Sequence, residues 1–304
     1  HRDLHKEYRR QRQMCIRDRS YPVFNFRKKG DSESKITDNE YLEYVRKAKE
    51  HCKRGDVFQL VLSRRFIQKF SGDEFNVYRA LRSINPSPYL FFFDYGDYKI
   101  FGSSPEAQII IKDGKSEIHP IAGTFKRTGN DEEDHNAAKE LAKDPKENSE
   151  HIMLVDLARN DLSRSGNNVK VEKNREIQFY SHVIHLVSKV TAVLKKNIKS
   201  FQVVEDTFPA GTLSGAPKHK ALELIEKYEK VNRNFYGGAI GYIDFNGNFN
   251  HAIIIRSFFS KNNILNYQAG AGIVIDSNPE KELEEVKNKL GALDKALNDA
   301  ELIK

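Results

Sequence analysis

Long apolar stretches are missing from this sequence. No run approaches the roughly 18 consecutive apolar residues that a membrane-spanning helix requires, so we expect no such span. The basic residues near the start are not followed by the apolar segment of a secretory signal peptide, and we therefore expect no export signal. The balance of 38% hydrophobic and 31% charged residues is typical of a globular chain that can bury a core.

Cysteine is also scarce. The two cysteines, Cys15 and Cys52, are far apart and fit neither a disulfide framework nor the spacing of a zinc site. Because nothing indicates export, we expect a reducing, cytoplasmic location. Neither thiol is a good candidate nucleophile. The residue beside Cys52 on its predicted helix, His51, points about 100° away from it.

The net charge of +7 is unevenly distributed. Residues 1–20 hold seven Lys or Arg and three Asp or Glu, so this short head carries +4 of the total. A basic head on a nearly balanced body is weak evidence for a nucleic-acid surface. The run Arg9–Ser20 has no helical or strand periodicity and resembles a translated sequencing adapter. We interpret residues 1–20 as a non-native head, with a genuine basic arm as the alternative, and residues 21–304 as one domain.

Hydrophobic periodicity and turn signals predict the following elements. Helices are expected over residues 38–54, from Asp144-Pro145 onward, over residues 217–231, and in a last segment where Leu283, Val286, Leu290, Leu293 and Leu297 form one apolar stripe. Strands are expected over residues 57–65, 89–94, 99–103, 107–112, 117–121 and 183–193, followed by a meander over 238–245, 249–260 and 264–275. Because strands occur in runs, we predict an α+β fold of antiparallel sheets covered by helices.

Two pairs of glutamates lie near predicted helix starts. Glu147 and Glu150 are three residues apart, as are Glu282 and Glu285, so each pair shares one helical face. Four carboxylates from two helix starts suit a hard cation such as Mg²⁺, which takes one or two protein carboxylates and completes its shell with water and substrate oxygens. The alternative is structural, because Glu147 occupies a capping-box position and acidic residues favour first turns.

Other segments are candidates for ligand contact. The glycine-rich segment Pro209–Pro217 leads into a helix, where backbone N–H groups can approach an anion. Gly270 and Gly272 interrupt a predicted strand, which often marks close approach of a ligand. Arg256 lies in an apolar strand and needs a partner, either a ligand carboxylate or a structural ion pair. A lone strand histidine such as His185 is by itself more typical of a core residue.

Together these segments resemble the chorismate-utilising enzymes over about residues 38–300. The matching segments are Pro120–Thr124, Glu147–Asp161, His185–Ser188, Gly211–Pro217, Tyr236–Gly238, Ile255–Ser257, Gln268–Gly272 and Glu285–Lys289. Agreement in so many motifs, in order, is highly specific. The resemblance implies an α/β sandwich of antiparallel sheets flanked by helices, and it makes residues 21–304 a chorismate-binding catalytic domain.

The resemblance also implies roles for individual residues. Glu150 and Glu285 would bind Mg²⁺ directly, and Glu147 and Glu282 through water, so that the ion holds the ring carboxylate of chorismate. His185 would be the acid/base residue beside the departing C4 hydroxyl, and Thr212 a polar residue of the catalytic pocket. The substrate-binding residues that it implies are Gly123, Thr124, Tyr236, Arg256, Gly270, Gly272 and Lys289.

Two side chains bear on the reaction. Relatives that add water to chorismate carry a lysine base where this sequence has Gln59, and glutamine cannot deprotonate water. Aminodeoxychorismate synthases typically carry a nucleophilic lysine where this sequence has Ala122. The resemblance therefore implies a Mg²⁺-dependent carbon–oxygen lyase of the anthranilate synthase type, in tryptophan biosynthesis. The alternatives are aminodeoxychorismate synthesis for folate, or an inactive fragment of the same fold.

The resemblance further implies a hetero-oligomer. The large subunits of this family take ammonia from a separate glutamine amidotransferase subunit, whose activated cysteine has no counterpart here. These subunits also have an N-terminal motif for feedback by tryptophan, which is not found, although Asn85–Leu90 resembles the other half of that site. We therefore expect this sequence to lack the N-terminal regulatory part.

Overall fold

A computed structural model describes residues 25–179 and 183–303, except the side chains of Thr124, Lys126 and Lys146. The predicted head, residues 1–20, lies outside the described residues. The helices are α2 (Asp38–Lys53), α3 (Phe75–Ile84), α4 (Asp131–Lys143), α5 (Pro145–Ser165), α6 (Ser200–Thr207), α7 (Gly211–Ser214), α8 (Lys218–Tyr228) and α9 (Pro279–Ala300). The strands are β1 (Phe26–Ser34), β2 (Gln59–Gly72), β3 (Tyr89–Asp94), β4 (Lys99–Ser104), β5 (Ala107–Lys112), β6 (Lys115–Ile118), β7 (Ile121–Lys126), β8 (Gly166–Phe179), β9 (Val183–Leu194), β10 (Gly215–Ala216), β11 (Ala239–Ile243), β12 (Phe249–Ile253), β13 (Ser257–Lys261) and β14 (Ile264–Ile273).

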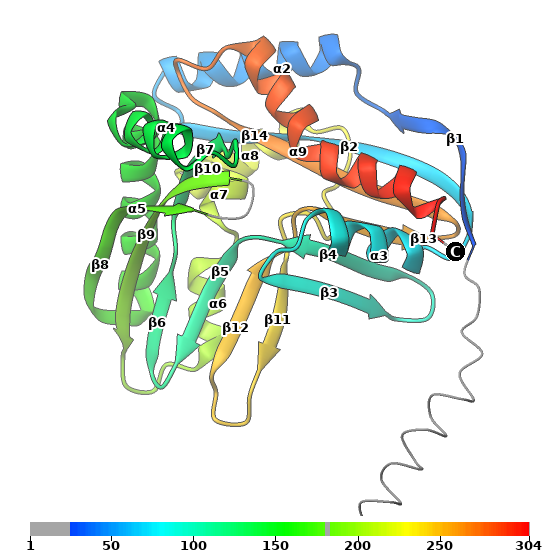
Figure 1. Cartoon of the computed structure of the whole chain (residues 1–304). Helices are drawn as coiled ribbons and strands as arrows, with labels where there is room; N and C mark the ends of the chain where they lie inside the picture. Colours follow the sequence, from blue (N-terminus) through cyan, green and yellow to red (C-terminus); the bar gives the residue numbers. More distant parts are fainter. Residues whose placement is uncertain (1–24, 180–182, 304) are drawn as a thin grey trace, which may run out of the picture.

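The first sheet has the strand order β1-β2-β14-β13-β4-β3, and the short strand β10 also pairs with β2. Its longest ladder joins β2 to β14, from Lys69 opposite Ile264 to Leu60 opposite Ile273. Helices α2, α3, α8 and α9 supply the apolar side chains that pack with this sheet into the largest core cluster. Figure 1 shows α9 running along β14 and β2, with α3 beside it.

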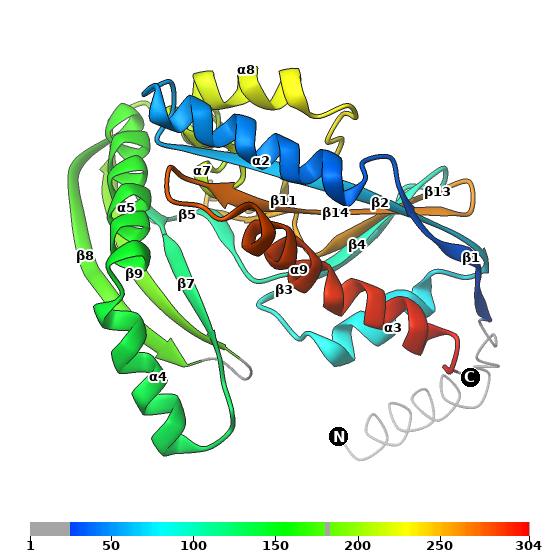
Figure 2. The ribbon, with the colours of Figure 1, turned by 90° about the horizontal axis from the view of Figure 1, so that it is seen from above.

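The second sheet has the order β11-β12-β5-β6-β9-β7, and β8 pairs with β9. All its pairings are antiparallel, as in the first sheet. Helices α5 and α6 pack on it through Val155, Ala158, Leu162 and Val203. Figure 2 shows α4 and α5 beside this sheet, apart from the helices that cover the first sheet. The predicted α+β class and the sandwich of antiparallel sheets flanked by helices are confirmed.

Among the points where the chain passes from one sheet to the other, two matter for the site: after β4, through Pro105 and Glu106, and after β12. The passage after β12 corrects a prediction. Residues 249–260 were expected to form one strand, but they form β12 in one sheet and β13 in the other. Arg256 lies at the break with a φ of 49°, in the left-handed region, and not inside a strand. Local apolar character could not reveal this break, because the two sheets that set it are assembled from distant segments.

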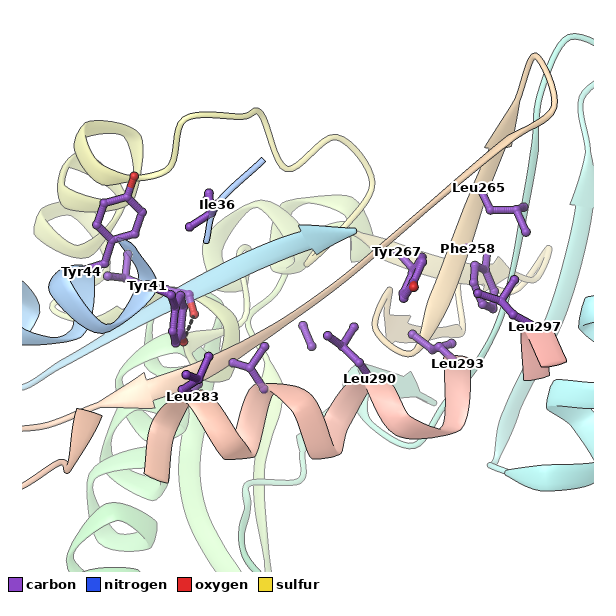
Figure 3. Packing of buried hydrophobic residues seen from close by; sticks show 14 of the residues in the cluster. Ile36, Tyr41, Tyr44, Phe258, Leu265, Tyr267, Leu283, Leu290, Leu293 and Leu297 are labelled. Atoms are coloured by element: carbon purple, nitrogen blue, oxygen red, sulfur yellow. Dashed lines mark hydrogen bonds between the residues drawn. The ribbon is translucent and has the colours of Figure 1, made fainter. Parts of the chain in front are cut away.

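The last helix is confirmed, including its stripe. Leu283, Val286, Leu290, Leu293 and Leu297 are all buried, and Figure 3 shows the labelled leucines directed toward β14 and Tyr267. Asn278 caps the helix start with its side chain, and Pro279 occupies the first turn. At about 25 cal/mol per Å² of apolar surface, burying such a stripe stabilises the fold by several kcal/mol.

Other boundaries differ from prediction in ways that have local causes. The expected strand 117–121 is divided at His119-Pro120, because proline has no N–H for a central ladder. Helix α8 begins after Pro217, which is its N-cap residue. Gly270 and Gly272 do not interrupt β14, which is continuous through them. No helix of the described residues is both long enough and apolar enough to cross a membrane.

Candidate active site

The passages after β4 and after β12 bring Glu106 and Arg256 into electrostatic contact. Burial raises the pKa of the Glu106 carboxyl to about 7, although a hydrogen bond from Thr212 and the charges of Lys289 and Arg256 oppose this shift. The Thr212 hydroxyl donates to Glu106 Oε1 at 2.9 Å. Burial in turn lowers the pKa of Arg256, and the negative charge of Glu106 opposes that shift. A half-buried arginine and a half-buried carboxyl of intermediate pKa therefore form the centre of the site.

Sequence reasoning missed Glu106. The only local signal is a Pro-Glu pair between two predicted strands, which is common at loops and says nothing about burial. Its environment comes from Thr212 and Arg256, which are more than a hundred residues away along the chain.

The ring of His185 lies beside Gly123. The His185 Nδ1 atom is 2.7 Å from the carbonyl oxygen of Gly123, so Nδ1 carries the proton and donates to it. Burial lowers the pKa of His185, and the charge of Arg256 lowers it further. Gly123 itself has a φ of 68°, and a Cβ there would lie 2.6 Å from Leu141 Cδ1 and 3.2 Å from Glu147 Oε2. The close approach therefore requires glycine.

Gly270 and Gly272 lie two residues apart on β14, and each is connected to a different acidic helix. Gln59 lies between Gly272 and α5, and Lys289 links Gly270 to Glu285 of α9. A Cβ on Gly272 would be 2.4 Å from the Gln59 amide nitrogen, which donates to Glu150 Oε1 at 3.2 Å. The Lys289 ammonium donates to the carbonyl oxygen of Gly270 at 2.9 Å and forms an ion pair with Glu285 at 2.7 Å. One carboxylate of each predicted pair is thus connected to the same segment of β14.

Tyr236 approaches the same segment from the loop after α8. Burial raises the pKa of its hydroxyl, while the charge of Arg233 and a hydrogen bond with the Gly270 backbone lower it. Tyr236, Gly270 and Lys289 therefore meet at one point of β14. The side chain of Thr124 lies outside the described part of the structure.

The other members of the acidic pairs are placed differently. The Glu147 carboxylate lies near Gly123. The backbone N–H of Glu147 donates to Asp144 Oδ1 at 3.0 Å, which is the capping predicted for this helix start. Glu282 is buried, with 3% of its surface exposed. Burial raises the pKa of Tyr41, and the charges of Glu282 and Glu285 raise it further, so both carboxylates lie near this tyrosine.

The donor set is compatible with a hard cation. Within residues 25–179 and 183–303, no group of three or more His, Cys, Asp or Glu side chains lies closely enough to hold a metal ion by itself. Mg²⁺ does not need such a group, because it is typically bound through one or two carboxylates together with water and substrate oxygens. Glu150 and Glu285, which approach β14 from different helices, can supply two carboxylates.

The sequence matches the family model described as chorismate binding enzyme over residues 1–295. The chain belongs to the chorismate binding enzyme family. Within this family it is 48% identical to anthranilate synthase component 1 of Aquifex aeolicus over 270 residues, which are 88% of this chain and 55% of that protein. The chain therefore spans about half the length of that relative.

Solved structures of chorismate binding enzymes share this fold. Anthranilate synthase component I from Streptococcus pneumoniae matches with a TM-score of 0.83 and 36% identity, over 96% of this chain and 66% of that one. The menaquinone-specific isochorismate synthase of Escherichia coli matches with the same TM-score of 0.83 at 23% identity, over 92% of this chain and 65% of that one. Because a different synthase has the same fold, the fold does not identify the reaction.

Proposed function

We propose that this chain carries the catalytic site of an anthranilate synthase, which converts chorismate and ammonia to anthranilate, pyruvate and water. The observation that carries the proposal is the position of Gln59. Its amide is buried between Glu150 and Gly272, where the water-adding relatives that the sequence resembles have a lysine base. An amide cannot activate water, so ammonia, which needs no activation, is the favoured nucleophile. The 48% identity to an anthranilate synthase component 1 supports the same choice.

Arg256 is suited to hold the enolpyruvyl carboxylate of chorismate. Its guanidinium is partly desolvated and lies near a carboxyl of intermediate pKa, so a ligand carboxylate would complete its charge balance. The hydroxyl of Tyr236, beside Gly270, is a second donor at this end of the site. Burial keeps this hydroxyl protonated at neutral pH, as a hydrogen-bond donor must be.

Glu106 is suited to act as the general acid. With a pKa of about 7, part of its population carries a proton at neutral pH that can pass to the departing C4 hydroxyl. Ammonia forms the new bond at C2 as the C4–oxygen bond breaks, and the hydroxyl leaves as water. The resemblance implied His185 as the acid/base residue beside this hydroxyl. Its lowered pKa instead favours a neutral ring, which is a poor proton donor.

His185 is suited to act as the base of the second step. Because Nδ1 donates to Gly123, the basic lone pair of the neutral ring is on Nε2. Removal of the C2 proton then expels the enolpyruvyl group, which takes up a proton to leave as pyruvate, and the ring becomes aromatic.

The acidic residues fit the Mg²⁺ that the family resemblance implies. Glu150 and Glu285 would hold the ion directly, and Glu147 and Glu282 through water. When bound, Mg²⁺ would neutralise the ring carboxylate of chorismate. Glu285 forms an ion pair with Lys289, and Glu150 accepts a hydrogen bond from Gln59, so both carboxylates already have partners on or beside β14.

A partner subunit is proposed as the source of ammonia. Burial raises the pKa of the Cys52 thiol to about 11, so it is protonated at neutral pH and unsuited to attack glutamine. Its neighbour His51 contacts Asp56 and Tyr228, at 2.7 Å each, and does not serve the thiol as a base. We therefore propose a hetero-oligomer with a glutamine amidotransferase. The cytoplasmic location remains a prediction.

Aminodeoxychorismate synthesis is the second candidate. Against it stands Ala122, a buried residue of β7, where the corresponding relatives have a nucleophilic lysine. The test is to incubate the purified chain with chorismate, Mg²⁺ and ammonium and to separate the products by chromatography. Anthranilate is expected. Aminodeoxychorismate or isochorismate as the main product would contradict the proposal.

A further inference from the structure

One edge of β2 lacks a strand neighbour beside the active site. On this edge, β1 pairs with residues 66–72 and β10 pairs with Gln59 and Leu60. Between them, no strand of the described residues pairs with residues 61–65. The opposite edge is paired with β14 from Leu60 to Lys69, and there Val61 lies opposite Gly272 and Ser63 opposite Gly270. The unpaired part of β2 is therefore the part that backs the two glycines of the site.

An ion pair between Glu229 and Arg233 occupies this gap. Glu229 Oε1 accepts hydrogen bonds from the N–H of Ser63 at 2.8 Å and from its hydroxyl at 2.7 Å. Arg233 Nη2 donates to the carbonyl oxygen of Val61 at 2.7 Å. The carboxylate thus replaces the carbonyl, and the guanidinium replaces the N–H, that a neighbouring strand would offer.

The pair also fixes the two segments that complete the site. Arg233 Nη1 donates to the carbonyl oxygen of Leu213 at 2.6 Å, next to Thr212, the hydrogen-bond partner of Glu106. The Arg233 guanidinium lies 5.8 Å from the ring centroid of Tyr236, three residues further along the loop. Glu229 and Arg233 hold each other through contacts of 2.8 Å and 2.5 Å, four residues apart.

The burial of this pair indicates that its role is not simply stabilisation. The side chain of Glu229 is 4% exposed and that of Arg233 is 17% exposed. Buried ion pairs are often no more stabilising than apolar side chains of the same size, because desolvation offsets the Coulomb attraction. An apolar pair, however, could not connect Val61, Ser63 and Leu213, because it forms no directed hydrogen bonds.

We propose that Glu229 and Arg233 are positioning residues, which hold Gly270, Gly272, Tyr236 and Thr212 in the arrangement that chorismate requires. The pair touches the backbone directly behind the two glycines and the loops that carry the other two residues. This proposal rests on the proposed function, since it concerns binding of the same substrate.

The test compares Arg233→Met with the control Arg64→Met. Arg64 is also a buried arginine of this region, but it contacts the carbonyl oxygen of Ile36 at 2.8 Å and Asp38 at 2.5 Å, in the segment that leads into α2. Arg233→Met removes a largely buried ion pair, and Arg64→Met removes a buried guanidinium that pairs with the more exposed Asp38, so both variants should lower the unfolding temperature. Arg233→Met should also raise the KM for chorismate by about tenfold or more, since small displacements in a site have large effects. Arg64→Met should leave this KM unchanged.

Two outcomes would overturn the proposal: a wild-type KM in Arg233→Met, or an equal rise of KM in both variants. If Arg233→Met does not fold, Glu229→Gln and Arg233→Lys take its place. Lysine keeps the charge beside Glu229 but cannot reach two carbonyl oxygens at once, so its KM should be intermediate. Calorimetric titration with chorismate gives the same comparison without turnover. A wild-type chain that binds chorismate but makes no anthranilate would therefore count against the proposed function alone.

Discussion

Replacing Glu106 by glutamine should lower activity and, at the same time, remove a pH-dependent loss of stability. Glutamine keeps the shape of the side chain and can still accept the hydrogen bond from Thr212. It has no proton to give to a leaving hydroxyl and no charge to bury. Activity therefore reports on proton donation by the carboxyl, and stability reports on the free-energy cost of burying its charge.

The size of the stability effect follows from the pKa of Glu106. A rise from the usual 4.5 to about 7 corresponds to about 3 kcal/mol against the ionised form in the folded protein. Since the folded-state pKa is the higher one, the folded state binds the proton more tightly. Stability is then full below pH 4.5 and is lost as the pH rises through about 7. Glu106→Gln should not show this loss.

The assay is urea unfolding at a series of pH values from about 5 to about 9. The difference in unfolding free energy between variant and wild type should shift in favour of the variant by up to about 3 kcal/mol across this range. The matched control is Asp134→Asn. Hydrogen bonds from Arg127 and Thr128 lower the pKa of this carboxyl, which is therefore ionised throughout the range. The effect of Asp134→Asn on the unfolding free energy should therefore not vary with pH.

Activity supplies the second half of this prediction. The turnover number of wild type should fall as the pH rises through about 7, and that of Glu106→Gln should be about 10²- to 10⁴-fold lower at the optimum. A variant with wild-type turnover, or a stability difference that does not change with pH, would refute the reasoning.

Three further predictions concern the metal, the substrate carboxylate and the nitrogen source. Glu150→Gln or Glu285→Gln should abolish turnover and calorimetric Mg²⁺ binding in the presence of chorismate, and full activity at ordinary Mg²⁺ levels would contradict the ligand assignment. Arg256→Lys should raise the KM for chorismate about tenfold or more, since a hydrogen bond to a charged group contributes roughly 1.5–3 kcal/mol, and an unchanged KM would mean a purely structural role. Cys52→Ser should leave the ammonium-dependent rate unchanged, and the chain should give no product from glutamine alone. Production of anthranilate from glutamine without a partner would point to an unknown site.

Local patterns predicted the elements whose signals lie within one segment. The apolar stripe of α9 and the Asp144-Pro145 start of α5 were correct because helix periodicity and capping depend on neighbours a few residues apart. The length of β2 beyond residue 65 was missed, because Ser63, Arg64 and Arg65 end its apolar run and the residues after them do not alternate. The left-handed break at Arg256 was hidden by apolar residues before it, which belong to a different sheet from the strand that follows.

The candidate site was likewise predicted only in part. The family resemblance named residues that the structure brings to one region, including Tyr236, Gly270 and Lys289. It did not indicate that Glu282 is buried, because α9 packs over a wider face than its leucine stripe suggests. The i, i+4 spacing of Glu229 and Arg233 is visible in the sequence. The unpaired backbone groups of β2 that they bind are not, because these depend on where β1 and β10 end.

The most direct test of the central claim follows anthranilate and pyruvate together in one reaction of the purified chain with chorismate, Mg²⁺ and ¹⁵N-ammonium. The proposed chemistry predicts that both products form at equal rates and that the anthranilate carries the nitrogen label, with no product when ammonium is omitted. An unlabelled hydroxylated product formed without ammonium, or release of pyruvate without anthranilate, would contradict it.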